Sequence, residues 1–393
     1  MARQWSGGHS AAVLCVGVSG DPGGPLASGG EAGEVALWAP DGTPLGTARL
    51  RGGEDVTCAV FSPVSPNALY VSHGEAVSAL DPRSLKGPAE ELRVGADEIN
   101  WLSPNETGAL MAAADDSGAV RVVELASGKV TRTLRRHTNI CSSVAFRPRR
   151  PHSLVSAGLD MQVMLWSLQK ARPLWTANLQ DFAEEEEEEG SVQSSGQLLN
   201  PPLAHCVSVA TCGNVVACGA EDGRVHLLQV GAGSRVERHV SLRTHSQGVS
   251  QTHFLSFLSH PYWLATGGND SQVALWDVSW ALGSTGGESK GGEAAPSRRH
   301  RGKRPVKPKA QVPADKLGQG VEEGASAAET GHTLSPGKDT GPRLRFSHGD
   351  KVNWLCPALL KGEPCLLVAD QGSAITVYSL SGISHKDSGS QPF

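Results

Sequence analysis

The sequence predicts an all-β protein in which seven similar units close into one ring. Two stretches carry the same four residue types in the same order, which indicates a repeated structural unit. In both, a hydroxyl residue precedes an aspartate by four positions, and a tryptophan follows that aspartate by six. No stretch shows a sustained helical period. The two copies consist of His137, Ser156, Asp160 and Trp166, and of His245, Thr266, Asp270 and Trp276.

The position of the tryptophan recurs seven times. Its first four occurrences are about 42 to 43 residues apart, which is the length of a four-stranded propeller blade. The later intervals are longer, and each surplus coincides with a low-complexity segment. These markers predict one seven-bladed β-propeller over residues 1–380 and a disordered tail over 381–393. The seven positions are Trp38, Leu80, Val123, Trp166, Leu228, Trp276 and Tyr378.

Strand signals follow one another along the units as short β-branched or aromatic runs separated by turn residues. The clearest runs are residues 13–16, 35–38, 144–146, 163–166 and 375–378. The seventh unit has no outer strand at its C-terminal side. Residues 2–5 are predicted to supply that strand and so to close the ring, which leaves no long exposed sheet edge.

Two inserts interrupt the rhythm. The acidic insert, residues 180–199, contains Glu184–Glu189, and the basic Gly/Ser-rich insert spans residues 279–341. Both contain too few large apolar residues to offset backbone ordering, so both are predicted to be disordered. The first joins an outer strand to the next inner strand, whereas the second precedes the outer strand at 343–346. These two connection types emerge on opposite faces of a propeller.

Composition narrows the class of protein. The formal net charge of −5 and the pI near 6.3 predict no global attraction to nucleic acid or membrane. Eight cysteines form no Cys-x-x-Cys pair and mostly occupy apolar runs, which indicates buried thiols in a reducing compartment. The first residues lack the apolar core of a signal peptide, and no run is long enough to span a membrane. We expect an intracellular protein, cytoplasmic and/or nuclear.

The His, Ser/Thr, Asp and Trp pattern resembles that of the WD40 repeat family, strongly in units 4 and 6 and fairly in unit 1. The resemblance implies a seven-bladed WD40 β-propeller that acts as a non-enzymatic, monomeric scaffold within protein complexes, without a cofactor or metal. It also implies that each set of four residues forms a buried hydrogen-bond chain. Loss of Asp160 or Asp270 is therefore expected to destabilise the protein more than any single change in units 2, 3 or 5.

Other units keep only parts of the pattern. Unit 1 has a partial tetrad of His9, Ser28 and Trp38, but Ala32 stands at the place of the aspartate. Unit 7 has His348 and Tyr378, while Asp370 lies two positions early.

A Ser–His–Asp hydrolase is the competing interpretation of the repeated pattern. It is disfavoured because the set occurs twice, one copy has threonine, and no Gly-x-Ser-x-Gly elbow is present. Residues 331–338 match a phosphate-binding loop only loosely, since five residues separate the glycines and aspartate follows the lysine. The histidines have no metal-ligand spacing. The sequence therefore predicts no catalytic, cofactor or metal site.

Three segments suggest partners. Leu80, Asp81 and Arg83 resemble the Trp-Asp-x-Arg box, by which WD40 proteins dock on the damaged-DNA-binding adaptor of cullin-RING ubiquitin ligases; the alternative is a surface Asp–Arg pair that shapes a turn. The basic run 298–309 is a solvated segment, a nuclear-import signal or, least favoured, a nucleic-acid contact. Glu184–Glu189 is a solubilising run or a contact for basic, histone-like tails.

Overall fold

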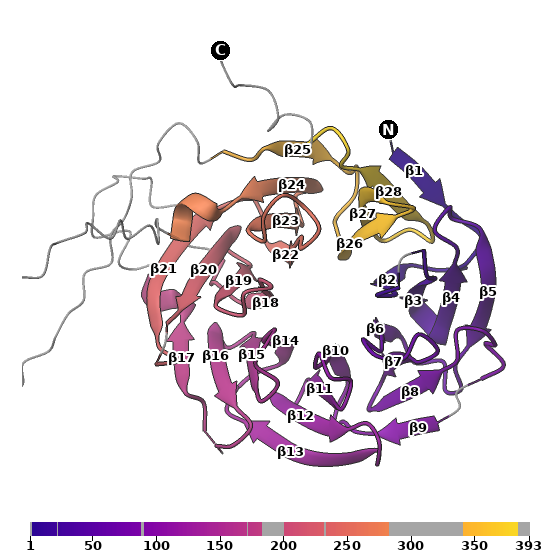
Figure 1. The fold of residues 1–393 in the computed structure, drawn as a ribbon, viewed down its shortest axis with the longest axis horizontal. Coiled ribbons are helices and arrows are strands. Elements are labelled where there is room, and N and C mark those ends of the chain that lie inside the picture. The colour runs from indigo at the N-terminus through magenta and orange to yellow at the C-terminus, as the bar shows by residue number, and fades with distance from the viewer. Residues whose placement is uncertain are drawn as a thin grey trace, which may run out of the picture. The chain divides into compact units, whose positions relative to one another are not determined.

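The computed structural model describes residues 2–21, 23–87, 90–170, 172–182, 200–231, 233–282 and 341–383. The chain divides into two compact units, Met1–Leu282 with Thr333–Phe393, and Gly283–His332. The second unit lies outside the described residues, as do most of both predicted inserts and the end of the predicted tail. In the first unit, seven four-stranded antiparallel sheets surround a central axis, which confirms the predicted propeller (Figure 1).

Each sheet forms one blade, whose strands we call inner, second, third and outer. Blade 1 contains β2 (Val13–Val18), β3 (Leu26–Gly30), β4 (Glu34–Trp38) and β5 (Pro44–Arg49); blade 2 contains β6 (Val56–Phe61), β7 (Leu69–His73), β8 (Ala76–Leu80) and β9 (Glu90–Arg93); blade 3 contains β10 (Ile99–Pro104), β11 (Leu110–Asp115), β12 (Ala119–Glu124) and β13 (Lys129–Arg135). A short 3-10 helix, η1 (Glu31–Gly33), joins β3 to β4.

The remaining blades follow the same order. Blade 4 contains β14 (Cys141–Phe146), β15 (Ser153–Gly158), β16 (Gln162–Ser167) and β17 (Trp175–Asn178); blade 5 contains β18 (Ala204–Val209), β19 (Val215–Ala220), β20 (Arg224–Val230) and β21 (Val236–Arg243); blade 6 contains β22 (Val249–Phe254), β23 (Trp263–Gly268), β24 (Gln272–Asp277) and β25 (Leu344–Ser347); blade 7 contains β26 (Trp354–Leu360), β27 (Glu363–Ala369), β28 (Ile375–Ser379) and β1 (Ala2–Trp5).

The ring closes where the sequence predicted. Strand β1 pairs with β28, with Ala2 opposite Tyr378 and Trp5 opposite Ile375. The Trp5 side chain is buried, with its ring 6.0 Å from that of Trp38 in blade 1. The N-terminal strand therefore joins blade 7 to blade 1 through both backbone pairing and apolar contact.

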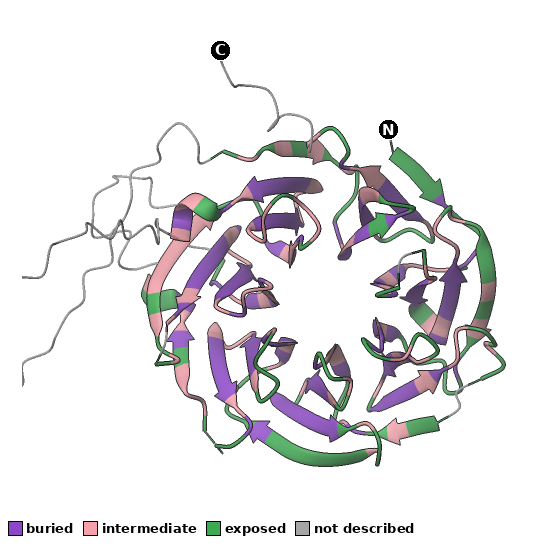
Figure 2. Cartoon of the chain, viewed as in Figure 1, coloured by how far each residue is buried: buried purple, intermediate pink, exposed green. Residues whose placement is uncertain are grey.

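The apolar core lies in layers between neighbouring blades. One such layer joins Ala112 and Val122 of blade 3 to Met164 and Trp166 of blade 4. Second and third strands are buried on both faces because a blade covers each side, whereas outer strands are largely exposed (Figure 2). This arrangement explains why the third strands have runs of apolar residues instead of a strict alternation.

A bulge at the second residue of six inner strands also links the blades. The β2, β6, β10, β14, β18 and β22 strands all shift register there. In four of these strands the bulged side chain donates a hydrogen bond to a backbone carbonyl at the inner strand of the next blade. Ser142 Oγ reaches the Ala204 oxygen at 2.6 Å, and Ser250 Oγ reaches the Val352 oxygen at 2.7 Å; Thr57 and Asn100 bond the Ile99 and Cys141 oxygens.

Aromatic side chains from three blades meet at the axis. The rings of Trp101 in blade 3 and Trp354 in blade 7 stack at 4.5 Å, and His253 in blade 6 stacks on Trp101 at 6.3 Å. Burial of His253 lowers its pKa to about 4. Trp354 Nε1 donates to the Val16 oxygen at 2.9 Å. The cluster therefore connects blades that are not neighbours in the ring.

Antiparallel pairing divides the connections between two faces of the ring. We call one the histidine face; it contains the outer-to-inner and second-to-third connections, including His137 and His245. The opposite, arginine face contains the inner-to-second and third-to-outer connections, including Arg83. The acidic insert follows β17 and the basic insert precedes β25, so these inserts belong to connections of opposite faces.

The first few residues of each predicted insert pack on the ring. Phe182 stacks on His239 of β21 at 3.7 Å. Ser279–Leu282 form the 3-10 helix η2, in which Ala281 is buried. The described residues 180–182 and 279–282 thus belong structurally to the propeller, because aromatic and apolar side chains within them find contacts that the polar composition of the inserts did not predict.

Candidate interaction sites

The two complete sets of His, Ser/Thr, Asp and Trp form hydrogen-bond chains inside blades 4 and 6. In blade 4, Trp166 Nε1 donates to Ser156 Oγ at 2.9 Å, and His137 joins Ser156 Oγ at 2.8 Å to Asp160 Oδ1 at 2.9 Å. In blade 6, the corresponding distances among Trp276, Thr266, His245 and Asp270 are 3.0, 2.9 and 2.8 Å. Each chain ties the third strand to the second strand and to the turn that precedes the third strand.

The burial of these chains argues against hydrolysis. Ser156 and Thr266 have no exposed surface, and the histidine side chains are at most 1% exposed. Each hydroxyl is already bonded to an indole and an imidazole. A substrate carbonyl therefore has no route to either hydroxyl, and the arrangement is suited to bracing the blade.

The aspartates of these chains are held in their charged form. Burial alone acts to raise the pKa of Asp160, but hydrogen bonds from His137, Thr138 and Gln162 outweigh it and lower that pKa below its usual value. The pKa of Asp270 is lowered in the same way, against desolvation, by His245 and by backbone N–H groups.

Blade 1 has a different acid beside its partial set. Trp38 Nε1 donates to Ser28 Oγ at 2.8 Å, and His9 contacts the same oxygen at 2.6 Å. Glu34 Oε2 lies 3.6 Å from His9 Nδ1 and accepts the backbone N–H of Ser10. Glu34 is thus the acid beside His9, on a strand position that the repeat spacing did not mark, but it forms no hydrogen bond to the buried His9 Nδ1.

Blade 7 shortens the chain. His348 Nδ1 lies 2.9 Å from Tyr378 Oη, and His348 Nε2 lies 2.8 Å from Asp370 Oδ2. Tyr378 provides its own hydroxyl, so no serine or threonine is needed between the ring and the histidine. The structure therefore brings together three residues whose spacing departs from the repeat.

Blades 2 and 3 replace the pattern with polar groups that the sequence spacing did not reveal. In blade 2, His73 at the end of β7 contacts Ser78 Oγ on β8 at 2.9 Å. In blade 3, Arg121 Nε lies 2.9 Å from Asp115 Oδ2, with side-chain exposures of 8% and 1%. The signal that was available is a charged residue within an apolar third strand, at Arg121.

The Leu80–Arg83 segment forms a preorganised hook on the arginine face. Leu80 is buried at the end of β8, whereas the Arg83 side chain is 68% exposed. Arg83 Nε and Nη2 donate to Asp81 at 3.0 and 2.6 Å, and the Arg83 backbone N–H donates to Asp81 Oδ1 at 2.9 Å. Hydrogen bonds from Arg83 lower the pKa of Asp81 to about 2, so the pair stays charged.

Exposed apolar side chains gather on the same face. Among the described residues, the large apolar side chains with the greatest exposure all lie at strand ends or connections of the arginine face. Leu45 and Val64, in blades 1 and 2, are 58% and 62% exposed. Val130 and Leu359 lie in blades 3 and 7. Exposed apolar groups beside a fixed charge are typical of surfaces that contact other proteins.

The histidine face of blades 1–3 is acidic. The connections between residues 31 and 118 on this face contain seven carboxylates and one arginine, Arg51. Burial raises the pKa of Glu98, and repulsion from Asp116, Asp55 and nearby acids raises it further. The seven are Glu31, Glu54, Asp55, Glu75, Asp97, Glu98 and Asp116.

Neither a metal site nor a reactive thiol emerges from the described part of the chain. Within it, no group of three or more His, Cys, Asp and Glu side chains is placed to hold a metal ion. All eight cysteines are free, and six of them are buried. Burial raises the pKa of Cys58 to about 12, which keeps that thiol protonated. No helix among the described residues is long and apolar enough to cross a membrane.

The ring of seven blades defines the chain as a β-propeller, and the tetrads of blades 4 and 6 are like those of WD40 repeats, which occur in protein-interaction scaffolds. The family model described as "WD domain, G-beta repeat" matches residues 128–167 and 237–277, which contain the two complete tetrads.

Over 69% of its length the chain is also similar to the WD repeat-containing protein 53 homolog of Dictyostelium discoideum. The two are 24% identical, and the match covers 77% of that protein. Two shorter likenesses are to Protein SLOW WALKER 1 of Arabidopsis thaliana, 33% identical over 29% of this chain, and to Ribosome biogenesis protein YTM1 of Pyricularia oryzae, 29% identical over 30%. These cover only 21% and 25% of those two proteins.

Proposed function

We propose that this propeller is a substrate receptor of a cullin-RING ubiquitin ligase and docks on the damaged-DNA-binding adaptor through Leu80, Asp81 and Arg83. The single observation that carries the proposal is the geometry of Arg83. Its guanidinium is fixed by Asp81 on one side and remains largely exposed on the arginine face. Nη1 of Arg83 has no partner in the described part of the chain, so it is available to a carboxylate or carbonyl of the adaptor.

The exposed apolar residues of the arginine face support this docking. Val64 lies in blade 2, as Arg83 does, and Leu45 lies in the neighbouring blade 1. Apolar contacts around a bidentate arginine supply burial that a single charge cannot. A substrate then binds elsewhere on the ring, and the histidine face is free for that role.

Arg83→Ala tests the hook. We expect adaptor capture by the purified chain to weaken about tenfold or more, because the interfacial charge pair is lost. The melting temperature should change little, since an exposed ion pair contributes at most about 1 kcal/mol. Lys86→Ala, an exposed cation in the same connection, is the matched control. If Arg83→Ala and Lys86→Ala capture the adaptor equally well, the hook is not used.

A second function is favoured by a separate observation, the acidic loops of blades 1–3. In this alternative the propeller is nuclear and binds basic, histone-like peptide tails. Glu184–Glu189, the acidic run predicted from sequence for this role, lies outside the described residues, whereas Asp97 and Glu98 belong to an exposed acidic surface. Opposite charges steer such a peptide and make its binding sensitive to salt.

Two variants distinguish the sources of acidity. We expect a lysine-rich peptide to bind more weakly to Asp97→Asn/Glu98→Gln, measured by fluorescence anisotropy at low salt, because two carboxylates that attract its lysines are neutralised. A variant with Glu184–Glu189 replaced by glutamine serves as the comparison. Undiminished binding in both variants would exclude an acidic recognition surface at either place.

A further inference from the structure

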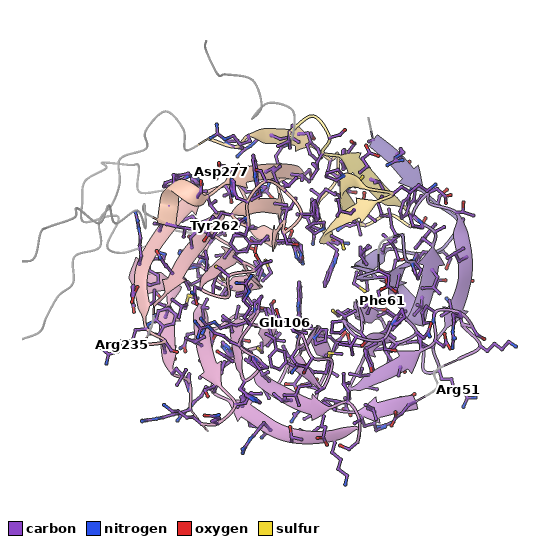
Figure 3. All side chains as sticks on the ribbon, in the orientation of Figure 1. Arg51, Phe61, Glu106, Arg235, Tyr262 and Asp277 are labelled. Atoms are coloured by element: carbon purple, nitrogen blue, oxygen red, sulfur yellow. The ribbon has the colours of Figure 1, made fainter. Side chains whose placement is uncertain are left out.

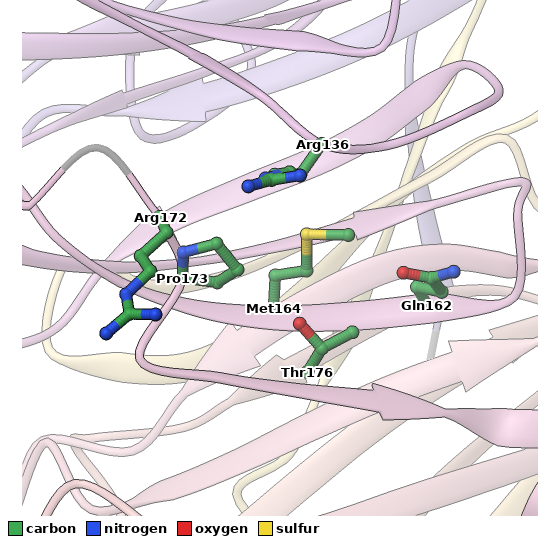
Figure 4. Close-up of a pocket in the computed structure, with 6 residues that line it drawn as sticks. All are labelled: Arg136, Gln162, Met164, Arg172, Pro173 and Thr176. Atoms are coloured by element: carbon green, nitrogen blue, oxygen red, sulfur yellow. The ribbon is translucent and has the colours of Figure 1, made fainter.

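A groove between blades 3 and 4 carries an excess of positive charge. It encloses about 370 Å³ and is lined by Arg136, Gln162, Met164, Arg172, Pro173 and Thr176. Figure 4 shows Arg136, from the segment after β13, facing Met164 across the groove, with Arg172 and Gln162 toward its two ends. Met164 is buried and provides an apolar floor.

The outer strand of blade 3 extends this basic wall. Leu134 of β13 packs with Met164 and Trp166 in the layer between the two blades. Because side chains alternate along a strand, Arg132 and Arg136 lie on the same side of β13 as Leu134. A second hollow, lined by Lys170, Arg172, Pro173 and Leu174, adjoins the groove on the blade 4 side.

These cations have no counter-charge of their own. Among the described residues, Arg132, Arg136, Lys170 and Arg172 form no ion pair. The nearest acids in sequence have other partners: Asp160 bonds His137 and two backbone N–H groups, Asp181 accepts from Asn178 Nδ2 at 3.1 Å, and Glu124 accepts from Ser127 Oγ at 2.6 Å. Several arginines in other blades do have an ion-pair partner: Arg3 pairs with Glu363, Arg49 with Glu34 and Arg83 with Asp81.

We propose that this groove binds a carboxylate-rich peptide segment of a partner protein. Arg136, opposite Met164, and Arg172, toward one end of the groove, each hold one acidic side chain, since a guanidinium pairs bidentately with a carboxylate. Gln162 and Thr176 bond the peptide backbone, and Met164 accepts an apolar side chain placed between the acids. The site lies apart from Arg83 and from the acidic loops, so it adds a partner to either proposed function.

Two other occupants fit the geometry less well. The chain's own acidic run begins two residues after Phe182, and Phe182 stacks on His239 on the blade 5 flank of blade 4. Strand β17 separates that flank from the groove. Single-stranded nucleic acid prefers aromatic rings for base stacking, and none of the six side chains that line the groove is aromatic.

The test uses the full chain and a short fluorescein-labelled peptide of alternating glutamate and alanine, with a glutamine–alanine peptide as the neutral probe. We expect the acidic peptide alone to raise its anisotropy on binding. Arg136→Glu/Arg172→Glu should weaken binding about tenfold or more, because two positive charges become negative and the net charge of the site falls by four units. Arg51→Glu/Arg235→Glu makes the same change at two exposed arginines that Figure 3 labels elsewhere on the ring, and should leave binding unchanged apart from a small long-range effect.

Three results overturn the proposal. One is equal loss of binding in the two double variants, which would show that only total charge matters. Another is binding that appears only after Glu184–Glu189 are replaced by glutamine, which would assign the groove to the chain's own acidic run. The third is tighter binding of a single-stranded oligonucleotide than of the acidic peptide, with the same dependence on Arg136 and Arg172. All variants should keep the melting temperature of the parent chain, since neither arginine has a structural partner.

Discussion

The neighbouring blades 3 and 4 brace their third strands with different polar interactions. In each, a polar group on the third strand must be tied to the second strand or the turn between them. Blade 4 uses a chain from Trp166 through Ser156 and His137 to Asp160. Blade 3 has Ala113 and Val123 at the places of Ser156 and Trp166, and it uses the ion pair of Arg121 with Asp115 instead.

The difference concerns what remains when one member is lost. Loss of Asp160 from the chain leaves the His137 ring and two backbone N–H groups without their acceptor, which costs about 1–3 kcal/mol. A broken buried ion pair leaves an uncompensated charge, which costs about 3–5 kcal/mol. Arg121 already has one buried nitrogen, Nη2, without a hydrogen-bond partner. Blade 3 is therefore the more vulnerable blade, although blade 4 has the more recognisable pattern.

Asp115→Ala should have the largest effect of any change in this comparison. We expect it to lower the free energy of unfolding by about 3–5 kcal/mol, because Arg121 loses its carboxylate and the Ala119 N–H loses its acceptor. Asp160→Ala should cost about 1–3 kcal/mol. Urea unfolding of both variants measures the difference. The repeated pattern alone predicts the reverse order, since it marks Asp160 and leaves Asp115 unmarked.

A double variant is the control for this order. Asp115→Leu/Arg121→Leu removes both charges together, so it should be less destabilising than Asp115→Ala alone. If the double variant is as unstable as Asp115→Ala, the loss comes from packing and not from the unpaired arginine. If Asp160→Ala proves the costlier single change, the distinction between the two blades fails.

The same two blades show which features could be predicted from the sequence. Strand rhythm and blade number depend on short-range patterns, so the seven blades and the closing strand 2–5 were predictable. Each tetrad also has a fixed spacing. Glu34 and Arg121 were missed because they lie on strand positions whose direction is set only by the packed blade. Trp101 and Trp354 stack across the axis, and their contact exists only once the ring has closed.

The Arg136 groove was missed for a related reason. Its walls come from the end of β13 and from the segment before β17. In sequence these two parts are separated by β14, β15 and β16 of blade 4. In sequence, Arg132 and Arg136 look like ordinary charges of an exposed strand. Which of these charges face blade 4 becomes clear only from the packing of Leu134 against Met164 and Trp166.

A fall in pH tests the other half of the comparison, the hydrogen-bond chains of blades 4 and 6, and we expect a smaller effect on stability. The pKa of Asp270 in the folded state lies below its usual value. The unfolded chain therefore binds a proton first as the pH falls, and folding loses stability from about pH 4 downward, through the folded pKa. Above about pH 4, the full contribution of the charged Asp270 is present.

The comparison with Asp270→Asn isolates this contribution from other groups. Burial lowers the pKa of His239 to about 4 and also lowers that of His226, so both histidines reduce stability from about pH 6.5 downward in every variant. The difference between the parent chain and Asp270→Asn should stay constant from pH 7 to about pH 5 and should shrink by pH 3, because a protonated Asp270 resembles asparagine. Urea midpoints at these pH values measure it. A difference that persists undiminished at pH 3 would mean that the charge of Asp270 does not stabilise blade 6, and that its hydrogen bonds act equally well in the neutral form.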